Sequence, residues 1–327
     1  MLMETDLQHT RRARRKASVG ILLLGALLTP SFPVRASDLL DTGLSSLPSE
    51  TLRLEYVSLE RLRRRPDYES LHQRYVGPRL EVLGTTMAKL GVQEDDIDEI
   101  VLAWLPGTKD KGFAGLATGR FSSSAISDRA AATGLTPTPV NGQELFCQET
   151  KAMEACVAVL STSLGAFGTR ESLTQMLAVR AGHGVGLTDN PTFMHLVDAG
   201  QARVAIWGVA VKPEVADWFN GWLAGQGAGP IDWSVLVQDV EVLTYRVDAD
   251  EAIRLQIKMD CSTPEAADHL RNFLEVVKVL LPLAWQSQNP GLPNPVRDLN
   301  VSLSGTRVSL ELNADSQGIR AAEQTLR

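Results

Sequence analysis

The chain has 327 residues with 44% hydrophobic side chains, a formal net charge of −7 and three cysteines. This acidic balance disfavours nonspecific nucleic-acid binding, whose affinity comes from Lys and Arg that replace counterions on phosphates. Beyond residue 36, no apolar run reaches the roughly 20 residues that a membrane-spanning helix needs. We therefore expect no nucleic-acid partner and no membrane span in the mature chain.

The first 36 residues have the pattern of a signal peptide. A basic stretch, residues 11–16, precedes a mostly apolar run from Ala17 to Leu28, which is too short to span a bilayer and fits the apolar region of an export leader. Small residues before Ser37 place the cleavage site between Ala36 and Ser37. The alternative is an uncleaved N-terminal anchor. Cleavage leaves 26 basic and 37 acidic residues, a net charge of −11, on a periplasmic or secreted protein.

The elements expected after the leader form two similar halves. A linker rich in Ser, Leu and Pro, residues 37–49, precedes a first half over residues 50–186 and a second half over residues 187–327. Alternating apolar residues predict the strands, and apolar residues three and four apart predict the helices. Each half then contains the order β-α-β-β-α-β of a split βαβ or ferredoxin-like unit, with an added strand and helix.

This order of elements predicts an α+β protein made of two tandem ferredoxin-like modules. Each module is expected to have an antiparallel sheet with helices on one face, which can leave the other face free. The two sheets would either pack on each other or run edge to edge. The layout resembles exported bacterial proteins of unknown function that are built from tandem ferredoxin-like units. Ferredoxin-like folds host many unrelated functions, so the resemblance implies no functional residues.

Few residues have the spacing of a catalytic or metal site. The four histidines of the mature chain have neither H-x-x-x-H nor zinc-finger spacing, so we expect no metal and no cofactor; they are His72, His183, His195 and His269. The glycines around His183 lack the preceding strand and following helix of a dinucleotide loop. No G-x-S-x-G elbow occurs. An enzyme is therefore less expected than a binding protein.

Two charged stretches are expected to be solvated. Residues 94–99 are acidic but lack the ligand spacing of a calcium loop, so they predict a connector before a buried strand. Residues 63–65 are three arginines that stop at Pro66, and they predict the exposed end of a helix rather than a binding patch.

Trp218, Phe219 and Trp222 are the strongest candidates for a binding surface, because aromatic side chains are enriched at protein interfaces. Their spacing of i, i+1 and i+4 also suits a helix that covers a sheet with its apolar face. Both interpretations stay open.

Cys147 and Cys156 are expected to form a disulfide. A two-residue turn at residues 151–152 places Cys147 opposite Cys156 in a hairpin, with Glu149 opposite Glu154. An oxidising compartment would allow the bridge to persist. Cys261 would remain a free thiol. A metal clip would need further ligands, and a redox pair usually has C-x-x-C spacing beside a helix.

Three functions follow from these features. The first is a non-enzymatic envelope protein that binds a protein partner or associates with itself. The second is an exported hydrolase with a dispersed active site, and the third is a carrier of a small hydrophobic ligand lined by the tryptophans.

Overall fold

The computed structural model describes residues 38–65, 68, 84, 86–107, 112–149, 154–200, 204–223, 233–248, 253–288 and 298–314. These residues belong to one compact unit, Ala36–Arg327. The expected signal peptide and the helix expected from Asp315 lie outside them. None of the described helices has both the length and the apolar character needed to cross a membrane.

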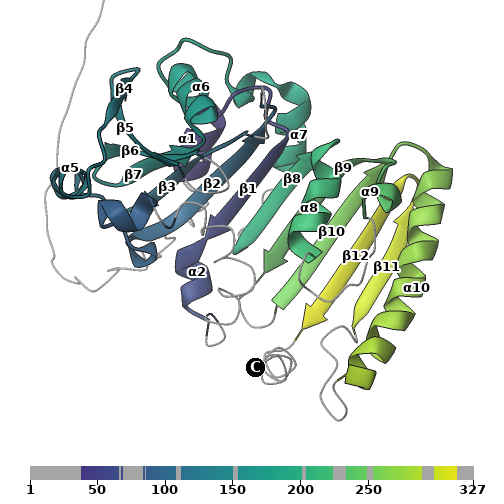
Figure 1. Ribbon diagram of the computed structural model, residues 1–327. Coiled ribbons are helices and arrows are strands. Elements are labelled where there is room, and N and C mark those ends of the chain that lie inside the picture. Colours follow the sequence, from purple (N-terminus) through teal and green to yellow (C-terminus); the bar gives the residue numbers. More distant parts are fainter. Residues whose placement is uncertain are drawn as a thin grey trace, which may run out of the picture. The chain divides into compact units, whose positions relative to one another are not determined.

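The described strands form one continuous antiparallel sheet (Figure 1), in the order β11-β12-β10-β9-β8-β1-β2-β3-β7-β6-β5-β4. The chain therefore has the α+β character and antiparallel pairing that the sequence predicts. The strands are β1 (Arg53–Ser58), β2 (Ile97–Leu105), β3 (Gly112–Gly119), β4 (Thr138–Val140), β5 (Gln143–Glu149), β6 (Glu154–Ser161), β7 (Leu164–Gly168), β8 (Ile206–Val211), β9 (Val240–Asp248), β10 (Ile253–Cys261), β11 (Leu299–Ser304) and β12 (Arg307–Ala314).

The two halves of the chain contribute strands in the same order. Counted outward from the junction, the first half gives β1-β2-β3-β7-β6 and the second gives β8-β9-β10-β12-β11, and the first half adds β5 and β4 beyond β6. The halves meet where β1 pairs with β8, antiparallel and edge to edge. The expected ferredoxin-like order is wrong, because a split βαβ unit needs parallel strands separated by a third strand. Here β1 and β2 flank helix α2 and pair directly with each other, antiparallel.

Helices cover both faces of the sheet. On one face, called the α8 face here, α2, α5, α8 and α10 contribute buried side chains to a single hydrophobic core. On the opposite face, called the α1 face, α1, α6 and α7 do the same. The helices are α1 (Asp38–Ser46), α2 (Leu59–Arg63), α5 (Ser123–Ala132), α6 (Arg170–Arg180), α7 (Pro191–Gly200), α8 (Glu214–Leu223), α9 (Trp233–Leu236) and α10 (Pro264–Gln288), with short 3-10 turns η2 (Glu94–Asp96) and η3 (Leu187–Asp189).

The α1 face corrects two expectations. Residues 37–49 contain a packed helix rather than a linker, since α1 buries Leu39, Leu40 and Leu44 against α6 and the sheet. Leu47, just after α1, belongs to the same core. The backbone N–H of Leu187 donates to the carbonyl of Leu47 at 2.7 Å, which ties this segment to η3. Helices on one face alone are also wrong for the first half, because both of its faces carry apolar side chains that need cover.

In the second half, the strands farthest from the junction have helices on one face, as expected. Their apolar side chains alternate toward the α8 face, as Met259 of β10 and Val308 of β12 do. Their other side chains are polar and exposed or half-buried, including Arg254, Asn300, Ser302, Ser309 and Glu311. Helix α10 contacts β10, β11 and β12, and it continues past Pro282 rather than ending there.

Candidate functional site

The predicted disulfide is confirmed. Cys147 of β5 lies directly opposite Cys156 of β6, with Glu149 opposite Glu154, so the register is the one that the turn at residues 151–152 implied. The two sulfur atoms are bonded and the Cα atoms are 4.0 Å apart. Cys261 is a free, buried thiol. Burial raises its pKa to about 11, with Asp260 and Asp239 adding to the effect.

The three histidines that the structure describes are exposed and lie in different parts of the chain. Among the described residues, His183 follows α6, His195 is on α7 and His269 is on α10, while His72 lies outside them. One group of metal-ligating side chains comes close together within the described part of the chain, namely Cys147, Glu154 and Cys156. Its two sulfur atoms are joined to each other, so the thiolates that a metal would need are not present.

Trp218 and Phe219 are core residues rather than a surface. Their exposed fractions are 2% and 5%, and both belong to the core on the α8 face. The Trp218 ring packs at 4.7 Å from the ring of Tyr245 and at 5.0 Å from that of Phe219, measured between centroids. The side chain of Trp222 lies outside the described residues. These rings therefore contribute packing to the junction of the halves.

A buried polar cluster lies beside those rings. The carboxylate of Glu55 accepts a hydrogen bond from Arg53 Nη2 at 3.1 Å and another from the hydroxyl of Tyr245. The Arg53 guanidinium also stacks on Trp104, with Cζ 3.7 Å from the ring centroid. Burial alone would lower the pKa of Arg53, but Tyr245 and Glu55 outweigh it and the net shift is upward. No local pattern in the sequence predicts this cluster, because it joins residues of β1, β2 and β9.

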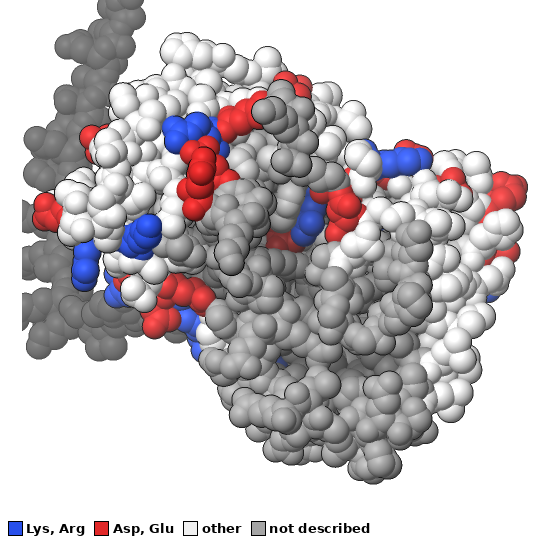
Figure 2. All heavy atoms as spheres, in the orientation of Figure 1, with Lys and Arg blue, Asp and Glu red and all other residues white. Residues whose placement is uncertain are grey.

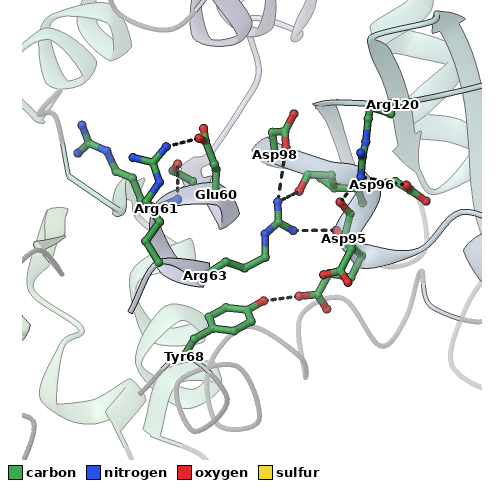
Figure 3. A network of polar contacts seen from close by, with 12 residues as sticks. Glu60, Arg61, Arg63, Tyr68, Asp95, Asp96, Asp98 and Arg120 are labelled. Carbon is green, nitrogen blue, oxygen red and sulfur yellow. Dashed lines mark hydrogen bonds and ion pairs between the residues drawn. The ribbon is translucent and has the colours of Figure 1, made fainter. Parts of the chain in front are cut away.

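The acidic connector contacts Arg63, the last residue of α2 (Figure 3). Arg63 donates to the carbonyl of Glu94 at 3.0 Å and to that of Ile97 at 2.7 Å, and it lies 3.5 Å from the Asp98 carboxylate. Arg120, which directly follows β3, donates to the carbonyl of Asp95 at 3.1 Å. The arginines thus hold the turn that leads into β2.

This network corrects the expectation of a solvated basic cluster. Arg64 is exposed, but Arg65 is buried and Arg63 exposes only 21% of its side chain. The connector is also less free than expected, since Tyr68 donates to the carboxylate of Glu94. Burial, followed by that hydrogen bond, raises the pKa of Tyr68. These charged groups serve to position β2 rather than to present a cationic surface.

The most exposed apolar surface of the described structure lies on α10. Four of its side chains are each between 54% and 61% exposed and follow the spacing i, i+3, i+4 and i+7 of one helical face. We call them the outer α10 stripe: Val276, Val279, Leu280 and Leu283. The inward face of the same helix carries Ala267, Leu270 and Leu274 in the core.

Charged side chains on α10 pair with each other: Arg271 lies 2.8 Å from Asp268 and Lys278 lies 3.4 Å from Glu275. Figure 1 places α10 at the right-hand end of the sheet, and the right-hand margin of Figure 2 shows acidic side chains in its upper part and mostly uncharged ones below. The sequence also contains a signal for this stripe, because residues 276–283 repeat apolar side chains on the helix face opposite the predicted core face. A second apolar face on one helix indicates a surface with a partner, and the outer α10 stripe is the candidate functional site.

Comparisons with known proteins define the fold but no family. No family model matches the chain, and no curated protein matches it. Crystal form III of TP0453, from Treponema, is similar with a TM-score of 0.51 and 9% sequence identity, covering 87% of this chain and 98% of that one. Crystal form I of TP0453 gives a TM-score of 0.50 and 9% identity, with coverage of 86% and 96%. At this identity the similarity concerns the arrangement of helices and strands alone.

Proposed function

We propose that this chain is a non-enzymatic envelope protein that acts by binding a protein partner through the outer α10 stripe. The observation that carries the proposal is the exposure of four adjacent apolar side chains on one face of a regular helix. Removing apolar surface from water is favourable by roughly 25 cal/mol per Å². Contiguous apolar patches on a folded protein mark interaction sites more often than scattered single residues do.

The stripe suits the apolar side of a partner helix or groove. Its spacing presents Val276, Val279, Leu280 and Leu283 as one ridge, the form in which helices enter grooves. Glu275 and Lys278 pair with each other at 3.4 Å on the same helix. Because these two charges compensate each other within the helix, we expect the attraction between the stripe and its partner to be apolar rather than electrostatic.

A double substitution in the stripe tests the proposal. In Val279→Asp/Leu280→Asp, two charges replace the centre of the ridge, and binding of the partner should fall at least about tenfold, as for a central interface residue. The measurement is quantitative cross-linking of envelope proteins to the purified chain, followed by affinity determination for each protein captured. Both side chains are more than half exposed, so the far-ultraviolet circular dichroism should not change.

The matched control is Val185→Asp. Val185 is 59% exposed, as the stripe residues are, but it lies in the loop after α6. The control should retain the partners of the unmodified chain. If the stripe variant and the control retain the same partners with the same affinity, the binding surface is not on α10.

We also propose that the chain is exported and that its leader is removed between Ala36 and Ser37. The pattern of residues 1–36 supports this, and so does the disulfide Cys147–Cys156, because such bonds persist in oxidising compartments. Cell fractionation and N-terminal sequencing should find a periplasmic or secreted chain that begins at Ser37. Ala36→Arg should leave the leader attached, whereas an unmodified chain that keeps Met1 would refute cleavage.

Residues 50–186 and 187–327 are, in this proposal, two copies of one module. The matching strand order of the halves supports the duplication. Limited proteolysis should cut near residues 182–186 and release two fragments that each retain strand-rich circular dichroism. Fragments that unfold on separation would instead favour a single cooperative unit.

A further inference from the structure

The two edges of the sheet are protected to different degrees. At one edge, β4 has only three residues and contains Pro139, and both features discourage pairing with another strand. At the other edge, β11 has six residues and no proline. Among the described strands, β12 is its only neighbour. Within the described part of the chain, no strand pairs with the other side of β11, so this edge is less protected than the β4 edge.

The first half of the chain shows what this position in the fold can accept. By strand order, β6 corresponds to β11 and β7 corresponds to β12. On its far side β6 carries a further antiparallel strand, β5, which the disulfide Cys147–Cys156 joins to it. The same strand position thus accepts another antiparallel strand when one is offered. In the second half, the described residues offer no strand equivalent to β5.

The sequence of β11 fits a second copy of itself. An antiparallel pair centred on Val301 places Leu299 opposite the other copy's Leu303 and Asn300 opposite its Ser302. Apolar side chains then share the α8 face and polar ones share the other face, as the pleat requires. Leu303, which is 37% exposed, gains an apolar neighbour.

Charge also favours a second copy. A strand that pairs with itself about a two-fold axis brings each charged side chain near its own copy, where like charges repel. The six residues of β11 carry no charge, although the chain as a whole has a net charge of −7. Self-pairing here therefore has no repulsion between facing side chains.

We propose that a second copy of this chain adds antiparallel to β11, with the two-fold axis at Val301, so that the sheet continues from one copy into the next. The interface is isologous, as in most homodimers. One strand edge buries less area than a stable dimer needs, so the association is weak and depends on concentration. The surface is separate from the outer α10 stripe, so this proposal and the proposed function can fail independently.

Charge-swap variants test the pairing and its register. Asn300→Lys/Ser302→Lys and Asn300→Glu/Ser302→Glu each place like charges opposite one another across the axis, and each should raise the dimer dissociation constant by about tenfold. An equimolar mixture of the two variants places Lys opposite Glu and should restore association. The positions are exposed on the polar face, so the fold should tolerate both changes. Sedimentation equilibrium of the purified chain measures the association.

The control is Ser309→Lys on β12, which lies on the same polar face one strand from the edge, and it should dimerise as the unmodified chain does. An unmodified chain that stays monomeric up to millimolar concentration would overturn the proposal. Equal dimerisation by the Lys, Glu and unmodified chains would also overturn it. A third result would overturn the proposal as well: the dimer is lost in Val279→Asp/Leu280→Asp but is kept in both charge-swap variants. That result would place the contact between the copies on α10.

Discussion

Tyr245 of β9 donates a hydrogen bond to Glu55 of β1 across the intervening strand β8. The two residues lie in register with Gly208, which faces Glu55 on one side and Tyr245 on the other. The bond therefore links the second half of the chain to the first at the seam where their strands meet.

Tyr245→Phe removes this donor while keeping the ring. Glu55 is 1% exposed, so its carboxylate would lose a hydrogen bond in a site with little water. We expect the free energy of unfolding to fall by about 1–3 kcal/mol. Urea denaturation measures the change. Wild-type stability in Tyr245→Phe would mean that the hydroxyl contributes nothing at this seam.

Gly208→Ala should also destabilise the protein, for a steric reason. A Cβ atom at position 208 would lie 2.4 Å from Cζ of Tyr245, which a packed ring cannot accommodate without moving. Overpacking of this kind costs about 1–3 kcal/mol. In a Tyr245→Ala background the clash is absent, so Gly208→Ala should cost much less there. A double-mutant cycle that is additive would contradict the contact.

The disulfide should stabilise the folded chain by about 2–3 kcal/mol, because it joins two cysteines at a sequence separation of 9 and so restricts the unfolded chain. Cys147→Ala/Cys156→Ala should lower the free energy of unfolding from urea denaturation by that amount and reduce hydrogen-exchange protection in β5. Dithiothreitol should do the same to the unmodified chain and nothing to the double variant. Equal stability of the oxidised and reduced chains would exclude this role.

Arg63 and Arg64 form a natural matched pair. Arg63→Ala removes charged hydrogen bonds to two backbone carbonyls at the entry to β2, and we expect a loss of about 1.5–3 kcal/mol. Arg64→Ala removes an exposed ion pair with Glu60 and should cost about 0.3–0.5 kcal/mol. Chemical denaturation of both variants compares them. Equal losses would mean that Arg63 does not anchor the connector.

Cys261 should resist alkylation in the folded protein. Its pKa is raised to about 11 by burial, so little reactive thiolate exists at pH 8. The folded protein holds the thiol proton of Cys261 more tightly than the unfolded chain does. The free energy of unfolding therefore keeps its full value below about pH 9 and falls as the pH rises toward 11. Cys261→Ala should show a shallower loss over that range. Rapid labelling by iodoacetamide at pH 8 without denaturant would contradict the burial.

Local patterns in the sequence were sufficient for much of the fold. Strict alternation over residues 299–312 predicts the β11–β12 hairpin, because only a half-buried strand repeats every second residue. The disulfide register was predictable for a similar reason, since counting outward from a two-residue turn fixes each opposing pair. Cys147 and Cys156 therefore needed no information from distant parts of the chain.

Other features depended on distant contacts. Leu40 and Leu44 look like part of a linker until α6 and the sheet provide a surface for them. Pairing of β1 with β8 joins residues about 150 positions apart, and no local pattern specifies it. Arg63 appeared to be a solvent-facing charge because the carbonyls that it contacts belong to a later segment. By contrast, the turn at Asn141-Gly142 between β4 and β5 is local: both residues have positive φ, and an Asn-Gly pair favours such a hairpin turn.

The seam between β1 and β8 also affects how the chain emerges from the ribosome. Until residues 206–211 have been synthesised, β1 has β2 on one side and an open backbone edge on the other. Charged side chains on an open edge discourage pairing with other nascent chains. Arg53 and Glu55 lie on this temporary edge and become buried once the second half arrives. The same two residues would thus guard an incomplete chain against aggregation and later hold the completed one together.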